Sequence, residues 1–142
     1  MAPRSAAASR HRLERRALQA TVAAASMIPI LTGAAGVLIG PTFVGGPLDN
    51  PDLASHFAYL SGIFIGLGFL FLATVQGIER KGSAFRAAAS LVVCGGIARL
   101  LAFGLAGIPT TPHRLGLVVE LVVVPLIVLW QARVARRCAG EA

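Results

Sequence analysis

Four long apolar runs, separated by short polar stretches, dominate the hydropathy pattern of the chain. They cover residues 17–40, 53–78, 84–107 and 115–131. Helices of roughly 17–25 apolar residues cross the hydrocarbon core of a bilayer, because each residue rises about 1.5 Å. The pattern therefore predicts an all-α integral membrane protein, a four-helix bundle formed by residues 17–131.

Turn-forming residues separate the apolar runs. The stretch from Pro41 to Asp52 holds Gly-Gly-Pro and Asn-Pro-Asp sequences, and residues 108–114 hold two prolines. Asp52 is placed to act as the N-cap of the second helix. Pro29 and Pro125 lie inside the first and fourth runs, where neighbouring helices can satisfy the carbonyls that a proline frees. Pro29 predicts a kink.

The composition agrees with a membrane location. Of 142 residues, 56% are hydrophobic and 13% are charged, whereas a soluble domain has about 25% charged residues. Too few polar side chains are present to cover a surface that faces water. The net charge of +7 does not indicate a nucleic-acid partner, because the basic residues lie in short segments between apolar runs. The lipid bilayer is the expected surrounding.

The basic residues also predict an orientation. Residues 1–16, 79–86 and 132–142 together carry eleven of them, whereas the two other connecting segments carry one, Arg114. Positive charge accumulates on the cytoplasmic side of membrane proteins. We therefore expect a multi-pass protein of the bacterial inner membrane with both termini in the cytoplasm. Residues 1–16 and 132–142 would be basic tails, the first disordered or resting on anionic headgroups.

A cleavable signal peptide is the alternative interpretation of the first apolar run. The run covers residues 17–40 and is longer than the 7–15 apolar residues typical of a signal peptide. No convincing small-x-small cleavage site precedes the following loop. A retained helix is the favoured interpretation.

Two opposite charges interrupt the third and fourth runs. Arg99 lies roughly 12 Å and Glu120 roughly 8 Å from the outer ends of their helices, at 1.5 Å per residue. A lone charge near mid-membrane costs about 2.5–3.5 kcal/mol, so an inward-facing pair is favoured. Such a pair would fix the helix register, or form a ligand, ion or proton site; alternatively, Arg99 extends outward and has no partner.

A polar group precedes the apolar part of the second helix. Asp52, His56 and Tyr59 follow i, i+4, i+7 spacing and share one helical face. They would either anchor the helix in the headgroup region or form the mouth of an outward-opening pocket. In the second case Arg99 and Glu120 would form its floor, and these five residues are the predicted ligand-binding site.

The sequence contains no catalytic motif. Nucleophile elbows, paired carboxylates and phosphate-binding loops are missing. His56 and His113 with Asp49 or Asp52 could hold a metal, but their spacing is poor support for it. We therefore predict no catalytic residue, no metal and no cofactor.

Small residues recur at the spacing that lets membrane helices approach closely. Intramolecular packing is the favoured interpretation, with a homodimer seam as the alternative. The predicted packing positions are Gly36, Gly40, Gly62, Gly66, Gly95 and Gly96.

Three motifs stand out in the apolar runs. They are Gly95-Gly96-Ile97-Ala98-Arg99 with Gly107-Ile108-Pro109, the stretch Glu120 to Pro125, and Ser61-Gly62-Ile63-Phe64 with Gly66 and Gly68. Together they resemble a family of small bacterial membrane proteins, the domain of unknown function 4345 family. The resemblance covers roughly residues 20–131 and implies four spans but no established activity. A more distant similarity to DoxX-like four-helix membrane proteins lies in architecture alone.

The leading functional prediction is a non-enzymatic membrane protein with an outward-facing polar site. Its partner would be a small or lipid-like ligand, a partner membrane protein or a second copy of the chain. The alternatives are a small transporter subunit, which needs a glutamate free to exchange protons, and a membrane enzyme that uses His56 and Glu120 as acid and base.

Overall fold

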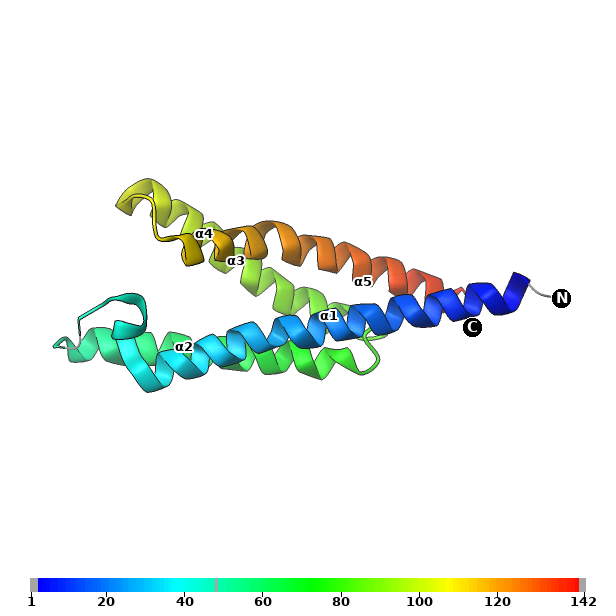
Figure 1. The fold of residues 1–142 in the computed structure, drawn as a ribbon, viewed down its shortest axis with the longest axis horizontal. Coiled ribbons are helices and arrows are strands. Elements are labelled where there is room, and N and C mark those ends of the chain that lie inside the picture. The colour runs from blue at the N-terminus through cyan, green and yellow to red at the C-terminus, as the bar shows by residue number, and fades with distance from the viewer. Residues whose placement is uncertain (1–2, 48, 141–142) are drawn as a thin grey trace. The chain divides into compact units, whose positions relative to one another are not determined.

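The computed structural model describes residues 3–47 and 49–140, and long helices make up most of them. Helices α4 and α5 join through a π-helix, η2, so the last three elements form one continuous span (Figure 1). The elements in chain order are α1 (Pro3–Ile39), the 3₁₀ helix η1 (Gly40–Val44), α2 (Pro51–Val75), α3 (Gly82–Ala106), α4 (Thr111–Val118), η2 (Val119–Val123) and α5 (Val124–Ala139).

Four helical segments of the described chain are long and apolar enough to cross a membrane. Many of their large apolar side chains are exposed, including Leu101, Leu105, Leu126 and Leu129. An apolar exterior is costly in water and favourable in lipid. The predicted all-α four-helix membrane architecture is confirmed, and the chain is a multi-pass membrane protein.

The first and last helices extend beyond the predicted spans. Helix α1 begins at Pro3 and continues through Pro29, so residues 3–16 are helical. The expectation for residues 1–16 was a basic tail that is disordered or rests on anionic headgroups. Alanine and arginine have high helix propensity, which explains the extension. Helix α5 likewise continues to Ala139.

The start of α2 differs from the prediction that Asp52 caps it. The side chain of Asn50 accepts a hydrogen bond of 3.0 Å from the Leu53 N–H. Pro51 occupies the first turn, where its fixed φ suits the helix and its missing N–H costs nothing. Asp52 therefore lies inside the first turn, where its negative charge interacts favourably with the positive end of the helix dipole.

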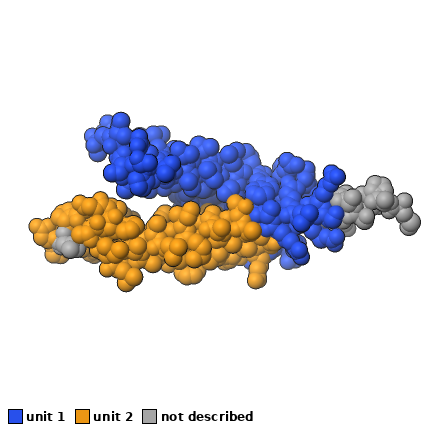
Figure 2. Space-filling model, in the orientation of Figure 1, with its two compact units in different colours: residues 1–18, 77–142 blue, residues 19–76 orange. Residues whose placement is uncertain are grey.

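The described chain divides into two compact units (Figure 2). Unit 1 contains residues 1–18 and 77–142, and unit 2 contains residues 19–76. Each unit has its own helix-to-helix packing.

In unit 2, α1 and α2 approach each other through small residues. A Cβ at Gly33 would lie 2.6 Å from the Ser61 carbonyl oxygen, and one at Gly36 would collide with the Ser61 hydroxyl. On α2, a Cβ at Gly68 would lie 2.5 Å from Ile30 Cγ1. Glycine at these positions lets the two helices approach without steric overlap.

The remaining glycines of unit 2 act differently. Gly40 has a φ of 70° and follows the last residue of α1, a backbone conformation that favours glycine. At Gly62 and Gly66 an added Cβ would meet no atom within 4 Å. Neither of these two glycines mediates close packing within unit 2.

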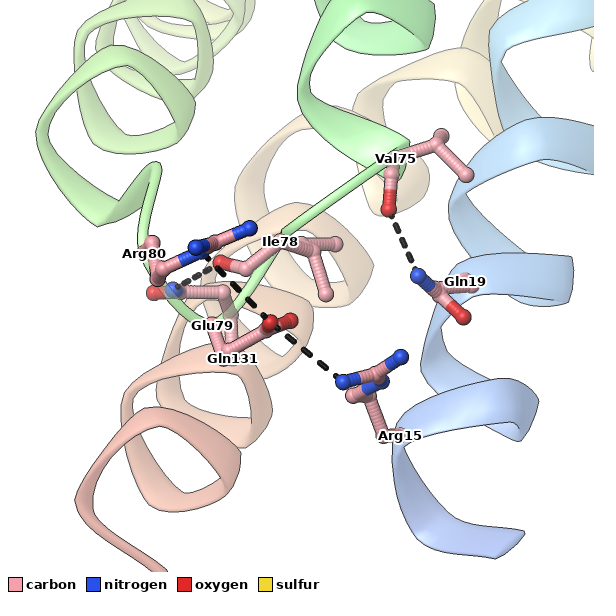
Figure 3. A network of polar contacts seen from close by, with 7 residues as sticks. All are labelled: Arg15, Gln19, Val75, Ile78, Glu79, Arg80 and Gln131. Atoms are coloured by element: carbon pink, nitrogen blue, oxygen red, sulfur yellow. Dashed lines mark hydrogen bonds and ion pairs between the residues drawn. The ribbon is translucent and has the colours of Figure 1, made fainter. Parts of the chain in front are cut away.

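Two glutamines bind carbonyls at and just beyond the end of α2. In unit 2, Gln19 Nε2 donates to the Val75 carbonyl oxygen at 2.8 Å. In unit 1, the fully buried Gln131 donates through Nε2 to the Ile78 carbonyl oxygen at 2.8 Å (Figure 3). Val75 ends α2, and the last carbonyls of a helix have no partner within it, so Gln19 provides one of the missing donors. Gln131 provides a donor to a carbonyl of the turn that follows α2.

Candidate functional site

Arg99 of α3 and Glu120 of η2 form a bidentate ion pair in unit 1. Arg99 Nε donates to Glu120 Oε2 at 3.0 Å, and Arg99 Nη2 donates to Glu120 Oε1 at 3.0 Å. The predicted contact between these two residues is therefore confirmed. Two parallel charge-assisted hydrogen bonds fix the relative orientation of the two groups.

Glu120 lies in a π-helical turn. The Val124 N–H bonds to the Val119 carbonyl oxygen, five residues back, in place of the usual four. Pro125 has no N–H, so the Leu121 carbonyl cannot receive the normal helical bond. The wider turn accommodates this loss, and such turns often occur at functional sites. Pro125 was the only signal for it in the sequence.

Gly96 provides the space in which the two spans meet. A Cβ at this position would lie 2.7 Å from Leu121 Cδ2 and 2.9 Å from Glu120 Cβ. A Cβ at Gly116 would be 4.0 Å from Glu120 Oε1, whereas one at Gly95 would meet no atom within 4 Å. Gly96, rather than Gly95, therefore brings α3 close to η2.

The two side chains of the pair are unequally buried. The Glu120 side chain is 12% exposed and the Arg99 side chain 34% exposed. A guanidinium has five N–H donors, of which Glu120 takes two. The other three have no acceptor among the described residues. Arg99 thus presents unused donors at a surface with exposed apolar neighbours, Leu100 and Leu101.

The other three predicted site residues belong to unit 2. Asp52, His56 and Tyr59 are all exposed on α2, and Tyr59 is 67% exposed. The structure thus brings Arg99 and Glu120 together and places the remaining three on an exposed part of another helix. The pocket that would unite all five stays a prediction.

Side chains with metal-binding chemistry are dispersed. Among the described residues, no group of three or more His, Cys, Asp or Glu side chains could hold a metal ion. His113 Nδ1 lies 3.1 Å from Thr110 Oγ1 near the start of α4, and Arg114 donates to Thr111 Oγ1 at 2.7 Å. In these contacts the His113 and Arg114 side chains are paired with threonines of the same loop and helix start.

Replacing one partner of the ion pair should destabilise the protein more than replacing both partners. Arg99→Leu or Glu120→Leu leaves an uncompensated charge, which typically costs about 3–5 kcal/mol in a buried pair. The double Leu variant should lose less than the sum of the two single losses. Thermal unfolding in detergent measures this difference, and simple additivity would show that the two residues do not stabilise each other.

Gly96 and Gly95 offer a matched pair of substitutions. Gly96→Val should lower the unfolding temperature by several degrees, because the new side chain overlaps Leu121 and Glu120. Gly95→Val adds the same atoms where the structure leaves open space, so it should have little effect. Equal effects of the two substitutions in thermal unfolding would contradict the assigned contact.

Comparison with known proteins adds a family but no function. No curated protein and no solved structure matches the chain. A family model described as a domain of unknown function, DUF4345, matches residues 17–131. This match covers all four spans except the ends of α1 and α5. The chain therefore belongs to the DUF4345 family of domains of unknown function.

Proposed function

We propose that the protein binds an amphipathic ligand with acceptor oxygens at Arg99. The observation that carries the proposal is the set of three unused N–H donors on Arg99, whose side chain is 34% exposed and whose guanidinium is already oriented by Glu120. A donor in an apolar surrounding is most stable when an acceptor reaches it. A carboxylate, phosphate or ester carbonyl provides such an acceptor.

The surroundings of Arg99 favour a ligand with an apolar body. Leu100 and Leu101 are exposed on α3, and Val119 and Val122 are exposed on the opposing span. A head group held by Arg99 would place its hydrocarbon portion along such side chains. Few polar groups within an apolar surface are typical of small-molecule sites. Asp52, His56 and Tyr59, which are exposed on α2, are proposed as ligand contacts of unit 2 by itself.

The alternatives have less support from the geometry. A proton-exchanging transporter or an acid–base enzyme needs the Glu120 carboxylate to be available to a proton or a substrate. Both of its oxygens accept hydrogen bonds from Arg99, and its side chain is 12% exposed. A second group would first have to displace Arg99. Ligand binding requires no such step.

The proposal places the protein in the bacterial inner membrane with both termini in the cytoplasm. The support is the uneven distribution of basic residues, eleven of which lie in residues 1–16, 79–86 and 132–142. The Arg99–Glu120 site would then lie in the outer half of the membrane.

Ligand binding can be tested with lipids of defined head group. We expect native mass spectrometry of the detergent-solubilised protein to show tighter binding of palmitate or lysophosphatidate than of a neutral monoacylglycerol. The Arg99→Leu/Glu120→Leu double variant should bind the two anions at least about tenfold more weakly, because charge-assisted hydrogen bonds contribute roughly 1.5–3 kcal/mol. This variant avoids the unpaired charge of either single change.

Two controls accompany this test. Arg114→Gln removes one positive charge from the loop before the fourth span and should leave binding unchanged. Tyr59→Ala and His56→Ala test the contribution of α2 by itself and should each weaken binding. Unchanged anion binding in the double Leu variant would exclude Arg99 as the ligand contact.

The orientation predicts which cysteine an impermeant reagent reaches. In intact cells, Cys138 near the end of α5 should resist an impermeant maleimide until the inner membrane is opened. A Cys introduced by Asp49→Cys in a Cys94→Ala/Cys138→Ala background should instead react without opening. Labelling of Cys138 from outside would reverse the proposed orientation.

A further inference from the structure

Positive charge gathers at the end of unit 1 where α1 begins and α5 ends. Residues 10–16, 79–86 and 133–137 hold ten basic and two acidic side chains. Ion pairs join these three segments, as described below, and we refer to them together as the basic end. A local excess of this size attracts anions.

Glu14 fastens α1 to α5 within the basic end. Arg133 Nε lies 3.3 Å from Glu14 Oε1, and Arg137 donates to Glu14 Oε2. One carboxylate thus holds two guanidinium groups from consecutive turns of α5. The two helix ends are joined, but their net charge stays positive.

Glu79 joins the α2–α3 turn to α1 in the same way. Arg15 Nη1 lies 3.4 Å and Arg80 Nε 3.9 Å from Glu79 Oε1, and Figure 3 shows the carboxylate between the two guanidinium groups. The second carboxylate oxygen of Glu79 is buried and has no partner. Both acidic side chains of the basic end are therefore used in positioning arginines.

Five exposed arginines of the basic end form no ion pair with the described residues. They lie on helices α1, α3 and α5. Glu14 links the start of α1 to the end of α5. Their guanidinium groups are therefore available to an external anion. They are Arg10, Arg12, Arg16, Arg86 and Arg136.

These arginines lie close to the ends of the membrane spans. Arg16 directly precedes the first apolar run, and Arg136 follows Trp130 by fewer than two helical turns. Tryptophan near the end of a span is typical of the membrane–water interface. At 1.5 Å per residue, Arg12 lies roughly 6 Å from Arg16 along α1, within the depth of a headgroup layer.

We propose that the basic end is a binding surface for the phosphates of anionic phospholipids. Guanidinium groups match phosphate oxygens in bidentate geometry, and anionic lipids attract basic segments at this depth. A bilayer already borders these residues, which favours lipid over a soluble polyanion such as RNA. The inference is independent of any ligand at Arg99.

The test compares phosphatidylglycerol with phosphatidylcholine on the full chain. Native mass spectrometry of the detergent-solubilised protein should show several-fold tighter binding of phosphatidylglycerol, and added salt should reduce the difference. Each change among Arg12→Gln, Arg16→Gln and Arg136→Gln should weaken phosphatidylglycerol binding about fivefold. In the Arg99→Leu/Glu120→Leu background, which removes the site proposed at Arg99, the triple Gln variant should lose the preference.

Three controls separate this surface from a general effect of charge or folding. The triple Arg→Lys variant keeps the charges and should retain a preference for phosphatidylglycerol. Arg114→Gln, in the loop before the fourth span, should change nothing. A triple Gln variant that still prefers phosphatidylglycerol in the Arg99→Leu/Glu120→Leu background would overturn the proposal. RNA that displaces phosphatidylglycerol at equal phosphate concentration would also overturn it in favour of a nucleic-acid site.

Discussion

The bidentate pair between Arg99 and Glu120 is the interaction on which the arrangement of α3 and the fourth span depends. Neither charge is favourable alone in a hydrocarbon surrounding, so each constrains the position of the other. Two further local features make the contact possible. Gly96 removes the side chain that would keep the spans apart, and the π-turn before Pro125 carries the carboxylate.

Polar contacts at the end opposite the α3–α4 loop complete unit 1. The buried Gln131 binds the Ile78 carbonyl, while Glu14 joins α1 to α5. Between these contacts and the Arg99–Glu120 pair, the described spans carry mainly apolar side chains. In lipid, apolar contact gives little preference for one helix pairing over another, so polar contacts and small residues specify the packing. Unit 2 follows the same rule through Gly33, Gly36 and Gly68.

The exposure of Arg99 is the feature of this pair that supports the proposed ligand. A contact that only fixed the helix register could be fully buried, with every donor satisfied. Here the carboxylate is enclosed while the guanidinium keeps three unused donors. That asymmetry supports the proposed ligand, whereas a glutamate that is engaged through both oxygens is a poor candidate for proton exchange.

The sequence alone was sufficient for the class of fold, the four spans and the Arg99–Glu120 contact. Hydropathy over a membrane-long window is a strong local signal, and two opposite charges within it have few other partners. The sequence did not decide which polar residue caps α2. Asn50 rather than Asp52 is the N-cap, because Pro51 already suits the first turn. Only the tertiary structure decided that Gly96 contacts the opposing span while Gly95, Gly62 and Gly66 do not. Which of several glycines meets a neighbour depends on how two helices rotate about their axes, and the spacing of small residues does not contain that information.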